Sequence, residues 1–436
     1  MSDTPFRYPA TLPIEPLTNV LNRSVSVPGS KSITNRALVL AALGGIHSCE
    51  LHGALQSEDT AVMIDSLRKL GMEIHCRDDS DVISLSHPEL LGKVSGKTEL
   101  FVGNSGTTIR FLTAMLGILN GRYRLDGIHR MRERPIEELL DGMRQLGVDA
   151  RSETNNECPP VIVHANGHMG GTARIRGDRS SQFLSGLLMV GPFTPTETII
   201  EIEGILVSEP YVAMTLTMIE EFGYRVEVGP GHRYRFPPQQ GRHFTGRYTI
   251  EPDASAASYF WATAAITTGR ITVLGLTRKS LQGDVAFVDC LEQMGCRVEE
   301  CDEGITVHGR PLRGIDVDMN AISDTVMTLG AVACFADGPT RIRNVAHIRH
   351  KETDRIAALA TELRKLGADV EEFADGLTIT PRPLTGCAVD TYNDHRMAMS
   401  LALIGLKIPG VIIKNPGCVA KTYPGFWQDL EKLRAE

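Results

Sequence analysis

The sequence predicts an α/β protein built from six copies of one structural unit, with three copies in each of two similar domains. Six helix-like stretches open on small polar or charged residues, and their first residues lie 70 to 75 positions apart. A constant spacing over this distance indicates a repeated supersecondary unit. A chain of 436 residues is also too long for one ordinary core, so two domains are expected. The six openings are Lys31-Ser32, Asn104-Ser105, Arg179-Ser180, Asp253-Ala254, Asp324-Thr325 and Asp394-His395.

Five of the six units also close in the same way, with a helix, then a glycine, then a strand. Glycine directly after a helix favours the left-handed position that ends it. Apolar residues then alternate with polar ones, as in residues 72–74, 148–150 and 226–228, which predicts half-buried strands. The sixth copy, FWQDLEKLRAE, has no strand after it. The five glycines, 72 or 76 residues apart, are Gly71, Gly147, Gly223, Gly295 and Gly367.

The domain boundary is expected between the third and fourth units. Residues 229–248 are rich in Gly, Pro and polar residues, which is typical of a connecting segment. The sixth unit lacks closing strands, whereas the N-terminal segment has no unit of its own. We therefore predict an N-terminal domain of residues 23–249 and a C-terminal domain of residues 1–22 plus 250–436. The chain would cross twice, near residues 22 and 250, and form a hinge able to close a cleft over ligands.

Composition excludes several classes of function. The net charge is −8, so a broad nucleic-acid-binding surface is not expected. No apolar run is long enough to span a membrane, and residues 1–20 lack the pattern of a signal peptide. The nine cysteines are scattered, which predicts reduced thiols in a cytoplasmic protein. Cys290, Cys296 and Cys301 are close in sequence but form no CxxC pair, so we expect packed core thiols and no metal.

The helix starts themselves predict anion binding. A helix N-terminus has unpaired N–H groups and the positive end of the helix dipole, and both attract anions. Gathered basic side chains in an acidic chain would focus positive potential into a cleft. The sequence therefore predicts binding of small, highly charged molecules. The basic residues at or near the helix starts are Lys31, Arg36, Arg110, Arg134, Arg355, Arg396 and Lys421.

The first opening follows a strand-like run that ends at Pro28-Gly29. Lys31 and Ser32 stand at the start of the helix, with Arg36 close behind. The GxxxxGK[ST] pattern is absent because Ser30 precedes the lysine, which excludes a P-loop nucleotide triphosphatase. A lysine at this position is opposed by the helix dipole, which favours a bound anion over a solvated lysine.

The second opening places glycines around Asn104, and Gly106 would permit close approach of the backbone to a ligand. Further on, Arg134 directly precedes Pro135, which we predict to be the first residue of a helix.

The third opening offers the neutral donors Ser180, Ser181 and Gln182. They suit a phosphate or sugar-like hydroxyls, and equally well plain N-caps. Ser208 and Tyr211 repeat this pattern at the next helix.

The second half of the chain carries carboxylates beside its basic residues. Lys351, Glu352, Asp354 and Arg355 fall within five positions before an amphipathic helix, where they either pair along its first turn or contact a ligand. Asp324 begins an almost wholly apolar helix, where capping alone would account for a carboxylate. Its equivalence in the repeat to the other site residues favours a chemical role equally well.

The last opening gives Asp394, His395 and Arg396, and Lys421 precedes the terminal helix. A single histidine such as His395 is more often a hydrogen-bonded structural residue than a catalyst.

Eight segments together resemble the EPSP synthase (3-phosphoshikimate 1-carboxyvinyltransferase) family of enolpyruvyl transferases. They lie in order along almost the whole chain: PGSKSITNRAL, GNSGTTIR, RERPI, SSQF, VSEPY, KETDR, NDHRMAM and AKT. The resemblance implies two domains of three βαβαββ units each, an inside-out α/β barrel. It implies transfer of the enolpyruvyl group of phosphoenolpyruvate to the 5-hydroxyl of shikimate 3-phosphate, with release of phosphate. No cofactor is implied, the partners are these two small substrates, and a monomer is expected.

The resemblance also implies roles for the site residues. Lys31 would contact both substrates, and Glu352 would lie beside the reacting carbon. Asp324 or Glu352 would be the base, and Lys31, Glu352 or Lys421 the acid. The implied ligands of shikimate 3-phosphate are Lys31, Ser32, Arg36, Ser180, Ser181, Gln182, Ser208, Tyr211, Asp324, His347 and Lys351. The implied ligands of phosphoenolpyruvate are Lys31, Asn104, Gly106, Arg134, Arg355, Arg396 and Lys421.

Two positions depart from the family pattern. His347 stands where the family commonly has Asn, four residues before Lys351, which leaves this substrate contact open. Phe111 follows Arg110 where many relatives have Pro.

Two other functions remain as alternatives. UDP-N-acetylglucosamine enolpyruvyl transferase shares the fold, but it typically has Lys-Asn in place of Lys31-Ser32 and a reactive Cys in the second unit. No Cys lies between Cys76 and Cys158 in this chain. A catalytically silent relative would be expected to lose charged site residues, which are present here.

Overall fold

The computed structural model describes residues 7–44, 48–77, 80–86, 97–238, 240, 244 and 246–434. The chain forms two compact units. Gly29–Ile250 is called here the N-terminal domain, and Met1–Pro28 with Glu251–Glu436 the C-terminal domain. Parts of the predicted connecting stretch (239, 241–243 and 245) and of the predicted N-terminal segment (1–6) lie outside the described residues.

The N-terminal domain consists of three repeats, each with a four-stranded sheet and two helices. In each sheet the first two strands are parallel, and the two later strands are antiparallel to their neighbours. Repeat one is β14 (Gly246–Thr249), α1 (Lys31–Leu43), β3 (Cys49–His52), α2 (Glu58–Lys69), β4 (Glu73–Cys76) and β5 (Ile83–Ser86). Repeat two is β6 (Lys97–Phe101), α3 (Gly106–Leu116), β7 (Asn120–Asp126), α4 (Glu137–Gln145), β8 (Asp149–Ser152) and β9 (Val161–Asn166). Repeat three is β10 (Gly171–Arg176), α5 (Ser181–Val190), β11 (Thr198–Glu203), α6 (Glu209–Glu221), β12 (Glu227–Gly229) and β13 (Arg233–Phe236).

The C-terminal domain repeats the same order, with a shortened last unit. Repeat four is β2 (Asn22–Val25), α7 (Ala254–Thr267), β15 (Arg270–Leu274), α8 (Phe287–Gln293), β16 (Arg297–Cys301) and β17 (Gly304–His308). Repeat five is β19 (Asp316–Asp318), α9 (Val326–Ala333), β21 (Thr340–Arg343), α10 (Arg355–Lys365), β22 (Asp369–Phe373) and β23 (Gly376–Thr380). Repeat six is β24 (Ala388–Val389), α11 (His395–Gly405), β25 (Val411–Lys414) and α12 (Phe426–Lys432), with β1 (Thr11–Ile14). A short pair, β18 (Leu312–Arg313) and β20 (Ala336–Asp337), is added between repeats four and five.

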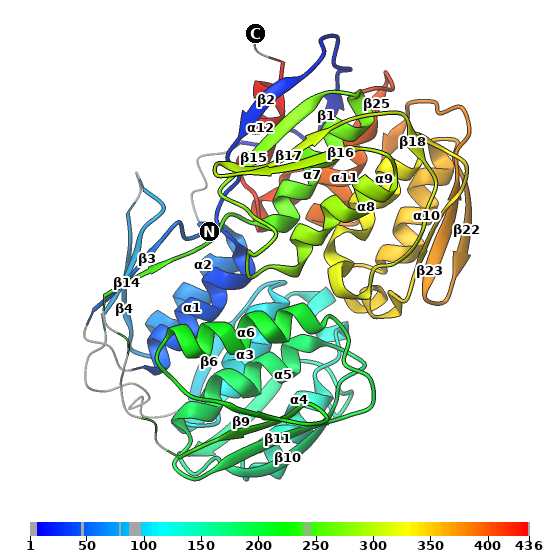
Figure 1. Cartoon of the computed structure of the whole chain (residues 1–436). Helices are drawn as coiled ribbons and strands as arrows, with labels where there is room; N and C mark the ends of the chain where they lie inside the picture. Colours follow the sequence, from blue (N-terminus) through cyan, green and yellow to red (C-terminus); the bar gives the residue numbers. More distant parts are fainter. Residues whose placement is uncertain are drawn as a thin grey trace. The chain divides into compact units, whose positions relative to one another are not determined.

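Helices occupy the interior of each domain and sheets the outside, so the inside-out α/β fold is confirmed. Figure 1 shows α7, α9 and α11 inside the C-terminal domain, with β15–β17 on one side and β22–β23 on another. The sequence of α7, ASAASYFWATAAIT, is apolar or small on every face, as an interior helix requires. Its Trp261 is fully buried. In the N-terminal domain α1, α3 and α5 pack against one another in the same way.

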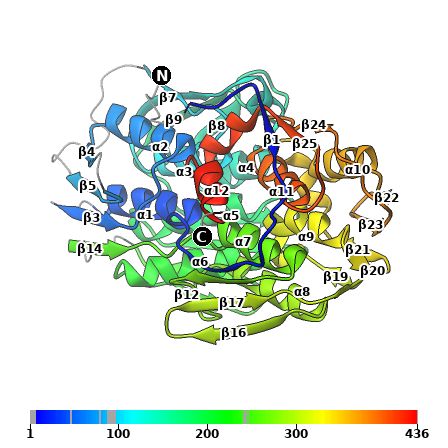
Figure 2. The same ribbon diagram turned by 90° about the horizontal axis from the view of Figure 1, so that it is seen from above.

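Three strands each join a sheet whose other strands lie far away in the sequence. β1 pairs antiparallel with β25 and closes the sixth sheet, where Figure 2 shows the two strands next to each other. β2 pairs parallel with β15 and begins the fourth sheet. β14, just before the second crossing, pairs parallel with β3 and begins the first sheet. Each domain therefore receives its first strand from the segment that precedes the other domain's first helix.

The position of the first crossing corrects the sequence prediction. The sequence predicts residues 23–28 to be part of the N-terminal domain, but the ladder between β2 and β15 ties this segment to the C-terminal domain. The chain crosses between Pro28 and Gly29 and again after Ile250. At the first crossing a side chain on Gly29 would collide with the carbonyl oxygen of Gly53, so only glycine fits.

Five of the six predicted helix starts and all five glycine turns are confirmed. At the remaining start, Asp324 lies in a 3-10 helix and α9 begins only at Val326, after a cap residue, Thr325, whose side chain makes no capping hydrogen bond. Side chains of Ser105, Ser180, Asp253 and Asp394 accept hydrogen bonds from backbone N–H groups in the first turns of α3, α5, α7 and α11. All five closing glycines are left-handed, with φ from 86° to 113°.

Three other local predictions were wrong. Val228 is 61% exposed, because β12 is the edge strand of its sheet. Pro135 is not the first residue of a helix, since α4 starts at Glu137 after the cap position Ile136. Cys301 is exposed at the end of β16, although Cys290 and Cys296 are buried. Among the residues that the structure describes, none of the helices has the length and apolar character needed to cross a bilayer.

Candidate active site

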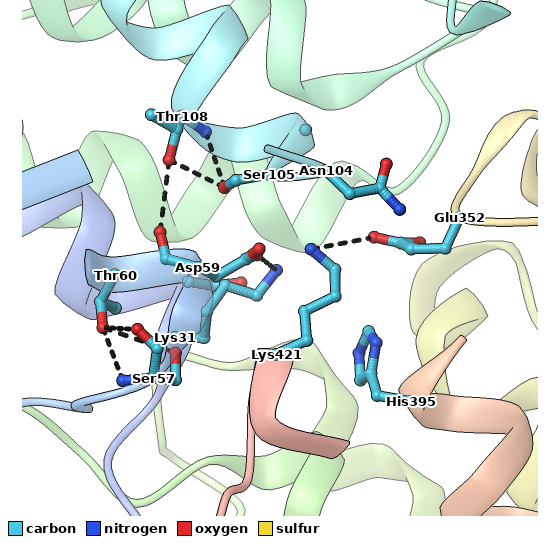
Figure 3. Close-up of polar contacts among 12 residues, drawn as sticks. Lys31, Ser57, Asp59, Thr60, Asn104, Ser105, Thr108, Glu352, His395 and Lys421 are labelled. Atoms are coloured by element: carbon cyan, nitrogen blue, oxygen red, sulfur yellow. Dashed lines mark hydrogen bonds and ion pairs between the residues drawn. The ribbon is translucent and has the colours of Figure 1, made fainter. Parts of the chain in front are cut away.

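In the N-terminal domain the site begins at the first turn of α1. Ser30 caps this helix, and Lys31 is its first residue. The Lys31 side chain is 12% exposed, and its Nζ lies 3.8 Å from Oδ2 of Asp59 on α2 (Figure 3). The carboxylate offsets the unfavourable field of the helix dipole on the lysine. Asp59 is not among the residues predicted from the sequence, because an acidic residue in the first turn of a helix looks the same as ordinary capping.

Arg36 lies beneath this turn, buried to 1% exposure. Its guanidinium donates to the carbonyl of Ser32 (3.0 Å) and to the hydroxyls of Thr215 (2.7 Å) and Ser185 (3.2 Å). Its Cζ lies 5.1 Å from the centroid of the Phe111 ring, a cation–π contact at the position where many relatives have Pro. Burial lowers the pKa of Arg36 to about 10. Arg36 therefore joins α1 to α3, α5 and α6 and fixes the backbone at Ser32.

Two more guanidinium groups converge on the start of α3. Arg134 donates to the carbonyl of Asn104 (3.0 Å), and Arg110 donates to the carbonyl of Gly106 (3.1 Å) and to Oε1 of Gln182 (3.0 Å). Both arginines are at least 96% buried. A Cβ on Gly106 would lie 2.8 Å from Cζ of Arg134, so glycine leaves the space that the arginine fills. The helix N-terminus and two cations together form an anion-binding arrangement.

The remaining residues predicted in this domain lie at the starts of α5 and α6. Ser180 caps α5 through the N–H of Gln182 (3.3 Å), and Ser181 is the first residue of that helix. Ser208 precedes α6 in a left-handed conformation with φ 53°. Strained backbone of this kind in a residue other than glycine occurs often at functional sites. The carbonyl of Tyr211 accepts a hydrogen bond from Arg36 (3.3 Å), which links this helix to the first turn of α1.

In the C-terminal domain Arg355 is the centre of the site. Its guanidinium binds Asp394 (2.8 Å), Glu352 (2.8 Å) and Asp324 (3.1 Å), and its side chain is 2% exposed. Burial disfavours its charge, but the carboxylates of Asp394, Glu352 and Asp324 outweigh this effect and raise the pKa of Arg355. One buried cation therefore orients three carboxylates. The sequence predicts no role for Asp394, because its contact with Arg355 is made between different repeats.

Asp324 is held by a second arginine. It lies in the 3-10 helix Asn320–Thr325 that precedes α9, and its Oδ2 accepts a hydrogen bond from Arg396 at 2.7 Å. The Asp324 side chain is 15% exposed, more than any other carboxylate bound to Arg355. The two oxygens of this carboxylate are therefore held by two different guanidinium groups, those of Arg355 and Arg396.

Glu352 and Lys421 form the third element of this half of the site. Lys421 ends the 3-10 helix Pro416–Lys421, and its Nζ lies 3.8 Å from Oε1 of Glu352. The two side chains are 7% and 9% exposed. The ring of His395 lies beside the lysine (Figure 3). Burial, followed by the charge of Arg396, lowers the pKa of His395 well below its usual range, so the imidazole is neutral.

His347 and Lys351 come from the segment before α10. His347 is 7% exposed in the 3-10 helix Ala346–His350, and Lys351 follows this helix directly. Burial, and then the charge of Lys351, lowers the pKa of His347 to about 4. His347 is therefore neutral near pH 7 and presents one donor and one acceptor, as the amide of the family's usual Asn does.

Comparison with known proteins agrees with this geometry. The family model described as EPSP synthase (3-phosphoshikimate 1-carboxyvinyltransferase) matches residues 17–430. The chain belongs to the EPSP synthase family. A relative from Nostoc punctiforme named 3-phosphoshikimate 1-carboxyvinyltransferase is 46% identical over 97% of this chain and 100% of its own length. A relative of the same name from Shewanella oneidensis is 44% identical over 97% of this chain and 99% of its own length.

The fold is also shared with solved structures of EPSP synthases. The structure from Acinetobacter baumannii superimposes with a TM-score of 0.80 at 24% sequence identity, covering 97% of this chain and 98% of that one. Within each domain, the site residues expected from the EPSP synthase resemblance lie at the starts of the inner helices or in the segments beside them. Among the described residues, no group of three or more His, Cys, Asp and Glu side chains is arranged to hold a metal ion.

Proposed function

We propose that this chain is an EPSP synthase that transfers the enolpyruvyl group of phosphoenolpyruvate to the 5-hydroxyl of shikimate 3-phosphate. The observation that carries the proposal is the buried Glu352–Lys421 pair beside Arg355, since it supplies an acid, a base and an anion-binding cation in one place. The chain is proposed to act as a cytoplasmic monomer.

Phosphoenolpyruvate carries a carboxylate and a phosphate, which guanidinium groups bind through paired charge-assisted hydrogen bonds. We assign its binding to Arg134 and Gly106 of one domain, with Asn104 nearby, and to Arg355, Arg396 and Lys421 of the other. Arg134 and Arg396 are held by a carbonyl and a carboxylate respectively, so both are preorganised before substrate arrives.

Shikimate 3-phosphate is an anion with several hydroxyl groups. We assign its phosphate and carboxylate to Ser32, Arg36 and the start of α5, where Ser180, Ser181 and Gln182 offer neutral donors. We assign further contacts to Ser208, Tyr211, His347 and Lys351. Lys31, at the first turn of α1, is proposed to contact both substrates.

The reaction proceeds by addition and then elimination, and the addition step needs two proton transfers. The hydroxyl that attacks C2 of phosphoenolpyruvate loses its proton, and C3 gains one, which gives a tetrahedral ketal phosphate. Elimination then removes a proton from C3, and phosphate leaves as the double bond forms. We assign acceptance of the hydroxyl proton to Asp324, and delivery and removal of the proton at C3 to the Glu352–Lys421 pair.

Phosphate release should require both phosphoenolpyruvate and shikimate 3-phosphate and should continue in excess EDTA. The cationic groups that stabilise the reacting phosphate are arginine and lysine side chains of the chain itself. Phosphate is measured colorimetrically in reactions that lack each substrate in turn. Loss of activity in EDTA, with recovery on adding one divalent metal, would contradict this mechanism.

Replacing Gly106 with alanine should raise the KM for phosphoenolpyruvate by about tenfold or more, because the new methyl group displaces the Arg134 guanidinium. The KM for shikimate 3-phosphate should change little. Gly229→Ala is the matched control, since its Cβ would meet only an ordinary contact of 3.6 Å with Arg233. Equal increases in both KM values would be inconsistent with the assignment of Gly106 and Arg134 to phosphoenolpyruvate.

A further inference from the structure

A buried chain of polar side chains ends on the Arg396 guanidinium. Ser255, the second residue of α7, accepts a hydrogen bond from a terminal nitrogen of Arg396 at 3.3 Å. The same hydroxyl donates to Oδ2 of Asp284, in the 3-10 helix Gly283–Ala286. Ser255 is 7% exposed and Asp284 3%. The roles assigned above use neither residue.

The direction of these hydrogen bonds is fixed by chemistry. A guanidinium has only donors, so the Ser255 oxygen must accept from Arg396. The single hydroxyl proton of Ser255 is then directed to the carboxylate of Asp284. The same Arg396 nitrogen also donates to Asp324 at 2.7 Å, so the guanidinium is held from two sides.

We propose that Asp284 is a positioning residue that acts through Ser255 to hold the Arg396 guanidinium in the orientation that receives phosphoenolpyruvate. The inference rests on the proposed function, because it assigns Arg396 to that substrate. Without Asp284, the Ser255 hydroxyl would lose the carboxylate that orients it, so its hydrogen bond with Arg396 would weaken, while Arg396 would keep its bond to Asp324.

The surroundings of the Asp284 carboxylate disfavour its charged form, so the ionised group lowers the stability of the folded state. Burial, and then the nearby Asp324 carboxylate, raises the pKa of Asp284 to about 6. The folded state therefore holds the proton more tightly than the unfolded chain. The contribution of Asp284 to stability falls as the pH rises from about 4 to about 6 and stays lowered above that range. A buried carboxylate that lowers stability fits the trade-off between stability and activity that is common at functional sites.

Asp253 at the cap of α7 and Asp324 disfavour the charge of Asp284, whereas Arg396 favours it. The carboxylates of α8, Asp289 and Glu292, pair with the exposed Arg278.

The first test is Asp284→Asn, which keeps the shape and removes the charge. At pH 8 the KM for phosphoenolpyruvate should rise about tenfold, while the KM for shikimate 3-phosphate stays within about twofold. The melting temperature should equal or exceed that of the wild type. As the pH is lowered from 8 to 5, the wild-type carboxylate becomes neutral as well, so the mutant-to-wild-type ratio of KM values should fall towards one.

Glu362→Gln is the matched control. The Glu362 side chain is also fully buried, but it bonds Lys365 and Tyr392, away from Arg396. This variant should lose stability and keep the wild-type KM for phosphoenolpyruvate at every pH.

Ser255→Ala provides a second, independent test, because it cuts the link without changing a charge. It should raise the same KM, and the double variant with Asp284→Asn should be no worse than the more impaired single variant. An unchanged KM in Asp284→Asn at pH 8, a ratio that does not depend on pH, or additive effects in the double variant would overturn the proposal. A wild-type protein without phosphate release from the two substrates would instead reject the proposed function itself.

Discussion

Replacing Arg355 with alanine is expected to lower the free energy of unfolding by about 3 to 5 kcal/mol, because removing one partner leaves buried charges uncompensated. Asp394 is fully buried, and Glu352 is 9% exposed. Urea denaturation at pH 7 measures the loss. The deficit should shrink below about pH 5, since the stranded carboxylates are then protonated.

Arg364→Ala is the control for this experiment, because Arg364 lies on the same helix but is exposed and donates to the carbonyl of Val370. It should cost about 1 kcal/mol or less. If Arg355→Ala were as stable as Arg364→Ala, Arg355 would not be the cation that holds the three carboxylates.

Asp324→Asn should reduce kcat by a factor of about 10² to 10⁴, the range for loss of a general base. The amide keeps the size of the side chain but cannot accept the hydroxyl proton. Asp318→Asn is the control, because Asp318 lies in the adjacent β19 and pairs on the surface with Arg343. A kcat for Asp324→Asn within about twofold of the control would remove Asp324 as the base.

The Glu352→Gln variant tests whether Glu352 and Asp324 have the different roles assigned to them. If Asp324 accepts the hydroxyl proton and Glu352 acts at C3, then Glu352→Gln should also stop exchange of the C3 protons of phosphoenolpyruvate with deuterated solvent. Proton NMR of the substrate pool follows this exchange. Undiminished exchange in the variant would mean that a group other than Glu352 transfers the proton at C3.

The parts of this structure that the sequence predicts are local. A helix start is encoded by its cap residue, as at Ser105 and Asp394, and a helix end by a glycine such as Gly147. These signals act within a few residues. Their repetition along the sequence is therefore enough to predict six units, even though it does not predict which strands pair.

The parts that the sequence did not predict depend on contacts between distant segments. The strand before α1 belongs to the sheet of another domain, and nothing within residues 22–25 encodes that partner. Asp59 and Asp394 looked like helix caps, and only packing brings them to Lys31 and Arg355. The Ser255–Asp284 link joins α7 to a segment 29 residues later, beyond the reach of any local pattern.

The central claim is that this chain joins phosphoenolpyruvate to shikimate 3-phosphate. It is tested most directly by phosphorus NMR of three parallel reactions containing phosphoenolpyruvate with shikimate 3-phosphate, with UDP-N-acetylglucosamine, or with no acceptor. We expect inorganic phosphate only in the first reaction, in equal amount to a new phosphate ester formed from shikimate 3-phosphate. Phosphate released with UDP-N-acetylglucosamine or without an acceptor, or none released with shikimate 3-phosphate, would contradict the proposed function.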